Sequence, residues 1–94
     1  MYERVVRFTD VDPSRMERLL AQINEADGPP PGVRTSRLKM LFDEKQRTAV
    51  AIQEFATEED MEEGAKVLAA MDASETPGTR VSVDACEVKL DLSA

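Results

Sequence analysis

One stretch decides the fold of this chain: residues 49–60, which read AVAIQEFATEED. Its first half has apolar side chains at alternate positions, the two-residue period of a β-strand. Thr57 follows, with the acid Asp60 three residues later, which is the spacing of a hydroxyl cap and an acidic partner at the start of a helix. The stretch therefore predicts a strand over Arg47–Phe55 that leads directly into a helix.

Toward the C-terminus, the helical period continues and then gives way to a last strand. The buried stripe of the helix is predicted at Met61, Ala65, Leu68 and Met71. A loop over Ser74–Thr79 is closed by a Pro-Gly pair. The final apolar run is about thirteen residues long where five or six are usual, and its apolar parity changes at Ala85–Cys86. Such a change predicts either a bulge or a change in what the strand packs against.

Toward the N-terminus, the pattern contains the remaining elements. Four segments are predicted there: a strand over Tyr2–Thr9, a helix from Pro13, a strand over Arg37–Phe42 and a polar turn over Asp43–Gln46. Asp12 is the expected cap of the helix, and Gly28 is its expected left-handed C-cap. Three consecutive prolines then make Gly28–Ser36 a stiff connection.

The elements follow one another as β-α-β-β-α-β, which predicts a single α+β domain over residues 1–94. The expected arrangement is ferredoxin-like, an antiparallel sheet with both helices on one face. In the later strands, however, apolar residues occur at both even and odd positions, and so on both faces of the sheet. Val50 and Ile52 share one face, and Ala49 and Ala51 share the other. The second face of such a sheet would be uncovered in a single chain. We therefore expect a homodimer that forms through the sheet faces.

Composition excludes several classes of chemistry. The chain has no histidine, and so lacks the usual general base near neutral pH, the commonest metal ligand and the ordinary haem ligand. We expect neither a metal nor another cofactor. Nineteen acidic residues against twelve basic ones give a net charge of −7, which disfavours nucleic acid and membranes as partners. The single cysteine, Cys86, cannot form an internal disulfide, and no leader or membrane span is visible, so a cytoplasmic location is expected.

Two known families share this order of elements. Residues 49–60 resemble the third strand and following helix of the RNA-recognition motif, which stacks bases on aromatic rings. The matching positions in this chain are Val50 and Ile52. Aliphatic side chains offer no π-face to a base, so RNA binding is disfavoured.

The second resemblance covers almost the whole chain, in Tyr2–Phe8, Gly32–Ser36, Phe55–Asp60 and Val81–Val88. These segments resemble small proteins of the antibiotic-biosynthesis-monooxygenase type, in the dimeric α+β barrel superfamily. The resemblance implies two ferredoxin-like units with their sheets in contact, and a ligand pocket between each sheet and its own helices. The chain departs from the enzymes of this group, since it has no tryptophan or histidine and its one asparagine, Asn24, lies late in the first helix. Haem degradation is therefore not implied.

Six residues are candidate ligand contacts: Tyr2, Arg4, Arg7, Gln53, Asp84 and Cys86. Arg4 and Arg7 belong to a strand expected at the centre of the sheet, where a buried arginine needs an acidic partner. Glu54 and Asp84 are the candidate partners on neighbouring strands. A structural ion pair is favoured over the alternative, in which Arg7 anchors an acidic ligand.

Packing interpretations are favoured for the other distinctive side chains. Tyr2 is expected to pack with its hydroxyl at a rim. Cys86 is expected to be a small buried hydrophobe and not a nucleophile, since no histidine can activate it. The acids of Glu58–Asp60 are expected to form a solvated helix start and not a cation site.

Three functions remain open. The first is a small homodimer that binds a hydrophobic or weakly acidic ligand between sheet and helices. The second, implied by the resemblance alone, is a cofactor-free monooxygenase or isomerase that acts on a quinol-like or polyketide-like substrate. The third is a structural or regulatory interaction protein. A cavity between sheet and helices would favour the first.

Overall fold

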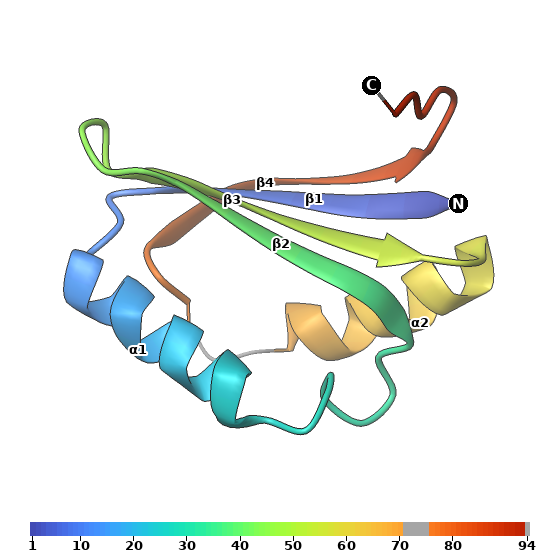
Figure 1. Cartoon of the computed structure of the whole chain (residues 1–94), viewed down its shortest axis with the longest axis horizontal. Coiled ribbons are helices and arrows are strands. Elements are labelled where there is room, and N and C mark those ends of the chain that lie inside the picture. Colours follow the sequence, from blue (N-terminus) through green and yellow to red (C-terminus); the bar gives the residue numbers. More distant parts are fainter. Residues whose placement is uncertain (71–75, 94) are drawn as a thin grey trace.

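The computed structural model describes residues 1–70 and 76–93. The elements follow the predicted order, and the α+β class is confirmed: β1 Tyr2–Thr9, α1 Pro13–Glu25, β2 Thr35–Asp43, β3 Thr48–Phe55, α2 Glu58–Ala69 and β4 Thr79–Glu87. The strands form one antiparallel sheet in the order β2-β3-β1-β4. Both helices lie on the same face of the sheet (Figure 1), an arrangement compatible with a ferredoxin-like fold. None of the helices in the described part of the chain has the length and apolar character needed to span a bilayer.

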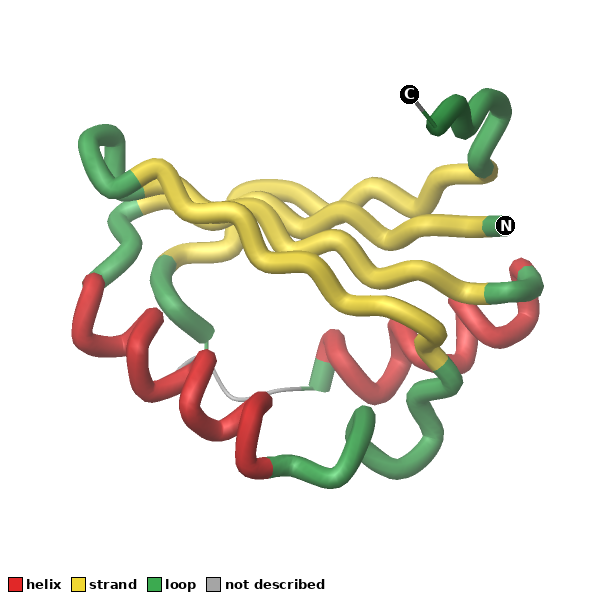
Figure 2. Tube along the Cα trace, viewed as in Figure 1, coloured by secondary structure: helices red, strands yellow, loops and turns green. Residues whose placement is uncertain are grey.

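The register of β1 decides which side chains share a face of the sheet. Residues paired directly across strands point to the same side. We call the side toward α1 and α2 the helix face and the other side the open face, which no described helix covers (Figure 2). The helix face includes Leu38, Met40, Ala49, Ala51, Gln53, Phe55, Tyr2, Arg4, Val6, Phe8, Val83 and Ala85. The open face includes Arg37, Lys39, Leu41, Val50, Ile52, Glu54, Glu3, Val5, Arg7, Ser82, Asp84 and Cys86.

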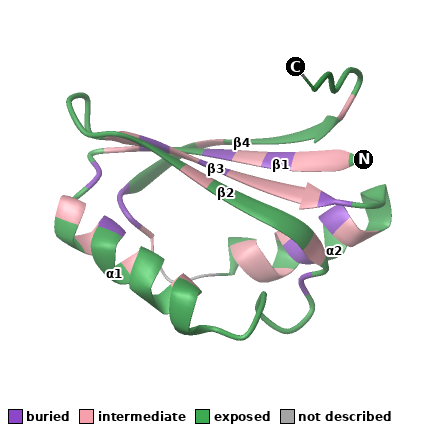
Figure 3. Ribbon diagram, viewed as in Figure 1, coloured by how far each residue is buried: buried purple, intermediate pink, exposed green. Residues whose placement is uncertain are grey.

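The core consists of two clusters on the helix face. One gathers apolar side chains of β1 and β3 around Met16 of α1. The other surrounds Phe55, which has no solvent exposure, with Met61 of α2 and Val33. Gly64 permits the close approach of α2, because a Cβ at this position would lie 2.9 Å from Phe55 Cε1. Burial is therefore concentrated on β1, β3 and part of α2, while most of β2 and β4 is exposed (Figure 3).

Capping explains where the helices begin. The Asp12 side chain accepts a hydrogen bond from Ser14 N at 2.8 Å, and Pro13 occupies the first turn of α1, as the sequence predicts. In α2, Met61 is buried and Leu68 is half-buried, which agrees with the predicted stripe. Met71 of that stripe lies outside the described residues, as do the first two positions of the predicted loop over 74–79.

The end of α1 differs from its prediction. The helix stops at Glu25, and the C-cap is Ala26 with an extended backbone (φ −74°, ψ 140°). Gly28 has the expected left-handed backbone, with φ +111°, but it lies two residues beyond the cap. The chain leaves the helix in an extended conformation first and turns at the glycine afterwards, just before the prolines.

The two middle strands also differ at their ends. β2 begins at Thr35, two residues earlier than predicted, because Thr35 Oγ1 donates a 2.7 Å hydrogen bond to Glu54 O and so holds this end of the strand to β3. β3 begins at Thr48, since Arg47 has φ +56° and belongs to the turn.

The last strand is shorter than predicted. β4 spans 9 residues and ends at Glu87, and residues 88–93 have no regular secondary structure. Cys86 is exposed in the chain, so the prediction that it is a small buried hydrophobe is wrong for the single chain. In the sequence, the apolar residues change from odd to even positions at Ala85–Cys86. In the structure, Ala85 still points to the helix face, and the apolar residues that follow β4 belong to a tail outside the sheet.

A bulge does occur in β4, but nearer its start. Arg7 of β1 pairs with Ser82, whereas the next residue of β1, Phe8, pairs with Arg80. Val81 is therefore the extra residue, and it is 63% exposed. The bulge has one consequence for the helix face: it turns Arg80 to the same side as Val83.

Candidate functional site

A cavity of about 750 Å³ lies between the helix face of the sheet and α1, and it reaches the proline-rich connection that follows α1. Apolar side chains from both layers form most of its wall. These include Val6, Phe8, Leu19, Ile23, Leu38 and Met40.

The sequence leaves this space empty for three local reasons. β3 contributes the small Ala51 and the polar Gln53 to the cavity wall, and no large apolar side chain. α1 buries a single side chain, Met16, near its start, so the rest of the helix is not drawn against the sheet. The prolines 29–31 then extend the chain along the cavity and form part of its wall. α2, by contrast, contacts the sheet closely through Gly64, and the free volume therefore lies chiefly under α1.

Arg4 is a buried, charged residue in this mostly apolar wall. It is only 4% exposed, the single charged residue in the buried class among the described residues. Its Nη1 donates a hydrogen bond of 3.0 Å to Gln53 Oε1, and its buried Nε has no hydrogen-bond partner among the described residues. Burial, and after it the positive charge of Arg80, hold the pKa of the Arg4 guanidinium below its ordinary value. The guanidinium stays charged near neutral pH even so.

The acidic partner predicted for Arg4 is not there. Glu54 pairs with Glu3, and Asp84 pairs with Val5. Both acids therefore lie on the open face, while Arg4 lies on the helix face. The ion pairs among the described residues do not include Arg4. The register thus leaves a buried cation without a carboxylate.

The six candidate residues divide between the two faces of the sheet. Arg4 and Gln53 come together in the cavity wall. Tyr2 shares their face but packs against the cluster around Phe55, outside the cavity. Its pKa is raised, first by the negative charge of Glu87 and then by burial and by Glu58. The remaining three candidates, Arg7, Asp84 and Cys86, are exposed on the open face.

Arg80 is a cavity residue that the sequence analysis missed. It is exposed and contributes to the cavity wall, which places it at the rim. The bulge at Val81 decides which face of the sheet Arg80 points to. A prediction that relies on alternation along the strand cannot tell where such a bulge occurs. The ionisable residues of the wall, within the part of the chain that the structure describes, are Arg4, Asp27, Arg37 and Arg80. Guanidinium groups donate hydrogen bonds and do not release their proton, so this wall is suited to hold an anion more than to transfer protons.

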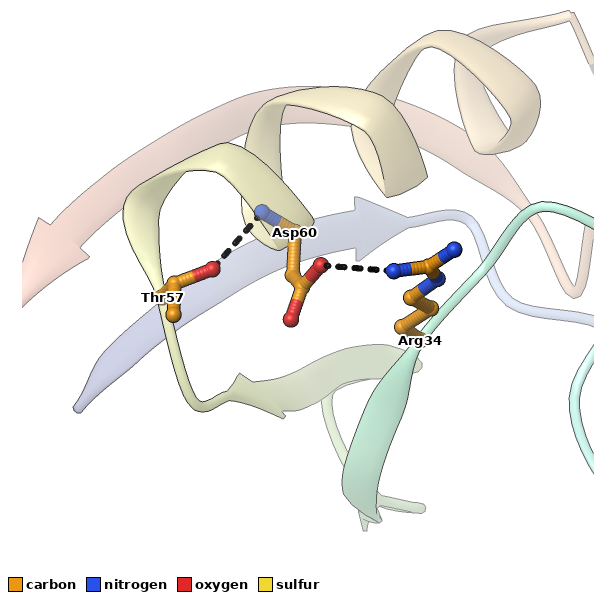
Figure 4. Close-up of polar contacts among 3 residues, drawn as sticks. All are labelled: Arg34, Thr57 and Asp60. Carbon is orange, nitrogen blue, oxygen red and sulfur yellow. Dashed lines mark hydrogen bonds and ion pairs between the residues drawn. The ribbon is translucent and has the colours of Figure 1, made fainter.

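The acidic start of α2 is the other place where a site was considered. Thr57 Oγ1 accepts a hydrogen bond of 3.1 Å from Asp60 N, and the Asp60 carboxylate lies 4.0 Å from Arg34 Nη1 (Figure 4). These are the contacts of a capped helix end with a weak surface ion pair. No group of three or more acidic or cysteine side chains in the described part of the chain could hold a metal ion.

Comparison of the chain with family models, with curated proteins and with solved structures finds no match. The candidate site is therefore defined by its residues and its geometry: a mostly apolar cavity whose wall includes the buried Arg4 and the exposed Arg37 and Arg80.

Proposed function

We propose that this chain is a small binding protein that holds a largely apolar molecule between its sheet and its helices. The cavity of about 750 Å³ carries the proposal, because small-molecule sites have volumes of ~300–1,000 Å³ and mostly apolar walls with a few polar groups. A domain of 94 residues has a modest core. Empty space removes packing contacts that such a core needs, which favours a binding role over a purely structural one.

The experiment is a titration with Nile red, a neutral fluorescent dye that brightens in apolar sites. Wild-type protein should bind it saturably, at one site per chain. Leu38→Trp should weaken this binding at least tenfold, because Leu38 lines the cavity and is 39% exposed, so a larger ring can fill the space without disturbing the core. Leu41→Trp is the matched control, on the same strand but on the open face and 46% exposed. Equal loss in both variants, or no saturable binding by the wild type, would contradict the proposal.

The same preparation separates binding from catalysis. Incubation with a panel of quinols and polyketide-like phenols, followed by oxygen uptake and product analysis, would reveal the oxygenase alternative if any compound is consumed. We also propose a cytoplasmic location, because Cys86 is the one cysteine of the sequence and cannot form an internal disulfide.

We further propose that two chains associate through their open faces, in the manner of the dimeric α+β barrels that the sequence resembles. Val5, Val50 and Ile52 on this face are half-buried, and Leu41 is exposed. The three central rows of the face carry three acids and three bases, namely Glu3, Glu54 and Asp84 with Arg7, Arg37 and Lys39. Asp43, at the end of β2 on the same face, brings the sum to −1 in a chain of net charge −7, so two copies can approach there with less repulsion than elsewhere.

Sedimentation at micromolar concentration tests this association. The wild type should sediment as a dimer, and Ile52→Glu should yield a folded monomer because it adds a charge at the centre of the face. Leu20→Glu, at a 38% exposed position on α1, should leave the dimer intact. A monomeric wild type at these concentrations would refute the assembly.

A further inference from the structure

We infer that the molecule held in the cavity is an amphipathic monoanion, an apolar body with one oxyanion group such as a carboxylate, which lies beside Arg4. The inference rests on the binding role proposed above and adds the chemical class of the ligand. Its basis is Arg4, which lies in the cavity wall, is almost fully buried and has no acidic partner in the part of the chain that the structure describes.

A buried cation without a counter-charge is an unusual feature in a folded chain. Moving a charge out of water has an effective cost of several kcal/mol, and natural proteins usually offset it with a paired acid. Here the two nearest candidate acids point to the opposite face of the sheet. Gln53 supplies only a neutral acceptor, to Nη1, and Nε remains without a partner among the described residues. An oxyanion in the cavity would supply the missing charge.

The shape of the unsatisfied group indicates how many charges the ligand carries. Gln53 accepts from Nη1, and Nε is itself buried from solvent, so a ligand in the cavity would meet the guanidinium at its terminal nitrogens. One guanidinium carries one positive charge and matches one oxyanion group such as a carboxylate. Gln53 is then a positioning residue, since its hydrogen bond holds the guanidinium in place.

Arg80 adds a second positive charge at the rim of the cavity. The Val81 bulge turns it to the helix face, opposite Phe8, and its charge acts on Arg4. Asp27 is the one carboxylate among the described residues of the wall, and it follows α1, in the layer that faces the sheet. The sheet side of the cavity is therefore positive in a chain whose net charge is −7, which attracts an anion to this side.

The remaining wall argues for an apolar body on the ligand. The cavity wall also includes Val6, Leu38 and Met40, and these side chains cannot replace the hydration shell of a small inorganic anion. A chain or ring attached to the oxyanion would cover them instead. We therefore expect a free inorganic anion to bind poorly, although it carries the same charge.

The experiment compares four probes that differ in one property each: decanoate, decanol, decylamine and inorganic phosphate, titrated at pH 7 against wild-type protein with Nile red as a displaceable reporter. Decanoate should bind at least tenfold more tightly than decanol, and decylamine and phosphate should bind more weakly still. In Arg4→Met, the preference for decanoate over decanol should disappear while Nile red still binds. Arg80→Met, at an exposed position that folding does not need, should reduce the preference several-fold.

Arg7→Met is the control, since Arg7 lies on the same strand but on the open face, and it should retain the full preference. Equal affinity of the wild type for decanoate and decanol would overturn the inference while the binding role survives. Loss of the preference in Arg7→Met as strongly as in Arg4→Met would overturn it too, because net charge alone would then explain the effect. Failure of Nile red and all four probes to bind would overturn the binding role itself.

Discussion

Replacement of Arg4 by methionine should make the unliganded protein more stable. Met keeps an unbranched apolar stem in a site that is 4% exposed, and it removes a buried cation with an unpaired Nε. An unsatisfied buried donor costs ~1–3 kcal/mol, and the effective penalty for a buried charge is several kcal/mol. Against this stands the loss of one hydrogen bond to Gln53, worth ~1.5–3 kcal/mol when one partner is charged.

The balance predicts a rise of about 1 kcal/mol or more in the free energy of unfolding, equivalent to an increase of ~4–8 °C in Tm for a domain of this size. Urea unfolding followed by far-UV circular dichroism measures it, with the slope expected to stay constant. Arg7→Met is the matched control and should change stability by less than ~0.5 kcal/mol, since Arg7 is exposed. A loss of ~2 kcal/mol or more in Arg4→Met would refute the reasoning, because Arg4 would then be a structural residue and not an unsatisfied one.

Three other predictions concern the second cluster and its surroundings. Gly64→Ala should lower stability by ~1 kcal/mol in thermal unfolding, because its Cβ would lie 2.9 Å from the buried Phe55 ring, and this crowding outweighs the gain in helix propensity. Thr57→Ala should lower the free energy of unfolding by ~1 kcal/mol in thermal unfolding, because α2 loses its N-cap. Thr57→Ser keeps the hydroxyl and should retain most of that stability. Tyr2 should titrate above pH 10 by ultraviolet absorbance, and Glu87→Gln should lower its midpoint. Because its folded pKa is raised, the contribution of Tyr2 to stability should be complete below pH 10 and decline as the pH rises through the folded pKa.

The fold could be predicted from the sequence because its signals are local. The Asp12–Pro13 and Thr57–Asp60 pairs open the two helices, as expected. Strand ends and the bulge were less predictable, because they depend on cross-strand contacts such as the hydrogen bond from Thr35 to Glu54 O. Residues 88–93 have the alternating apolar pattern of a strand, yet they form no strand. A strand also needs a neighbouring strand to pair with, and the pattern of one segment does not show whether such a neighbour is present.

The candidate site shows the same division. Arg4 and Gln53 could be named from the sequence, but their partnership depends on the pairing of β1 with β3. The expected acidic partners were wrong because neighbouring strands were not assigned a register, and a shift of one residue moves a side chain to the other face. Arg80 was missed for a related reason, since the bulge at Val81 reverses the alternation on which its face would have been predicted.

The loose attachment of α1 has a consequence for motion. With one buried side chain in 13 residues, this helix should open locally at a smaller free-energy cost than the central strands, and its amide protons should exchange with solvent sooner than those of β1 and β3. A molecule seated beneath α1 would slow that exchange without a change of fold. Hydrogen–deuterium exchange could therefore report occupancy of the space before the natural occupant is known.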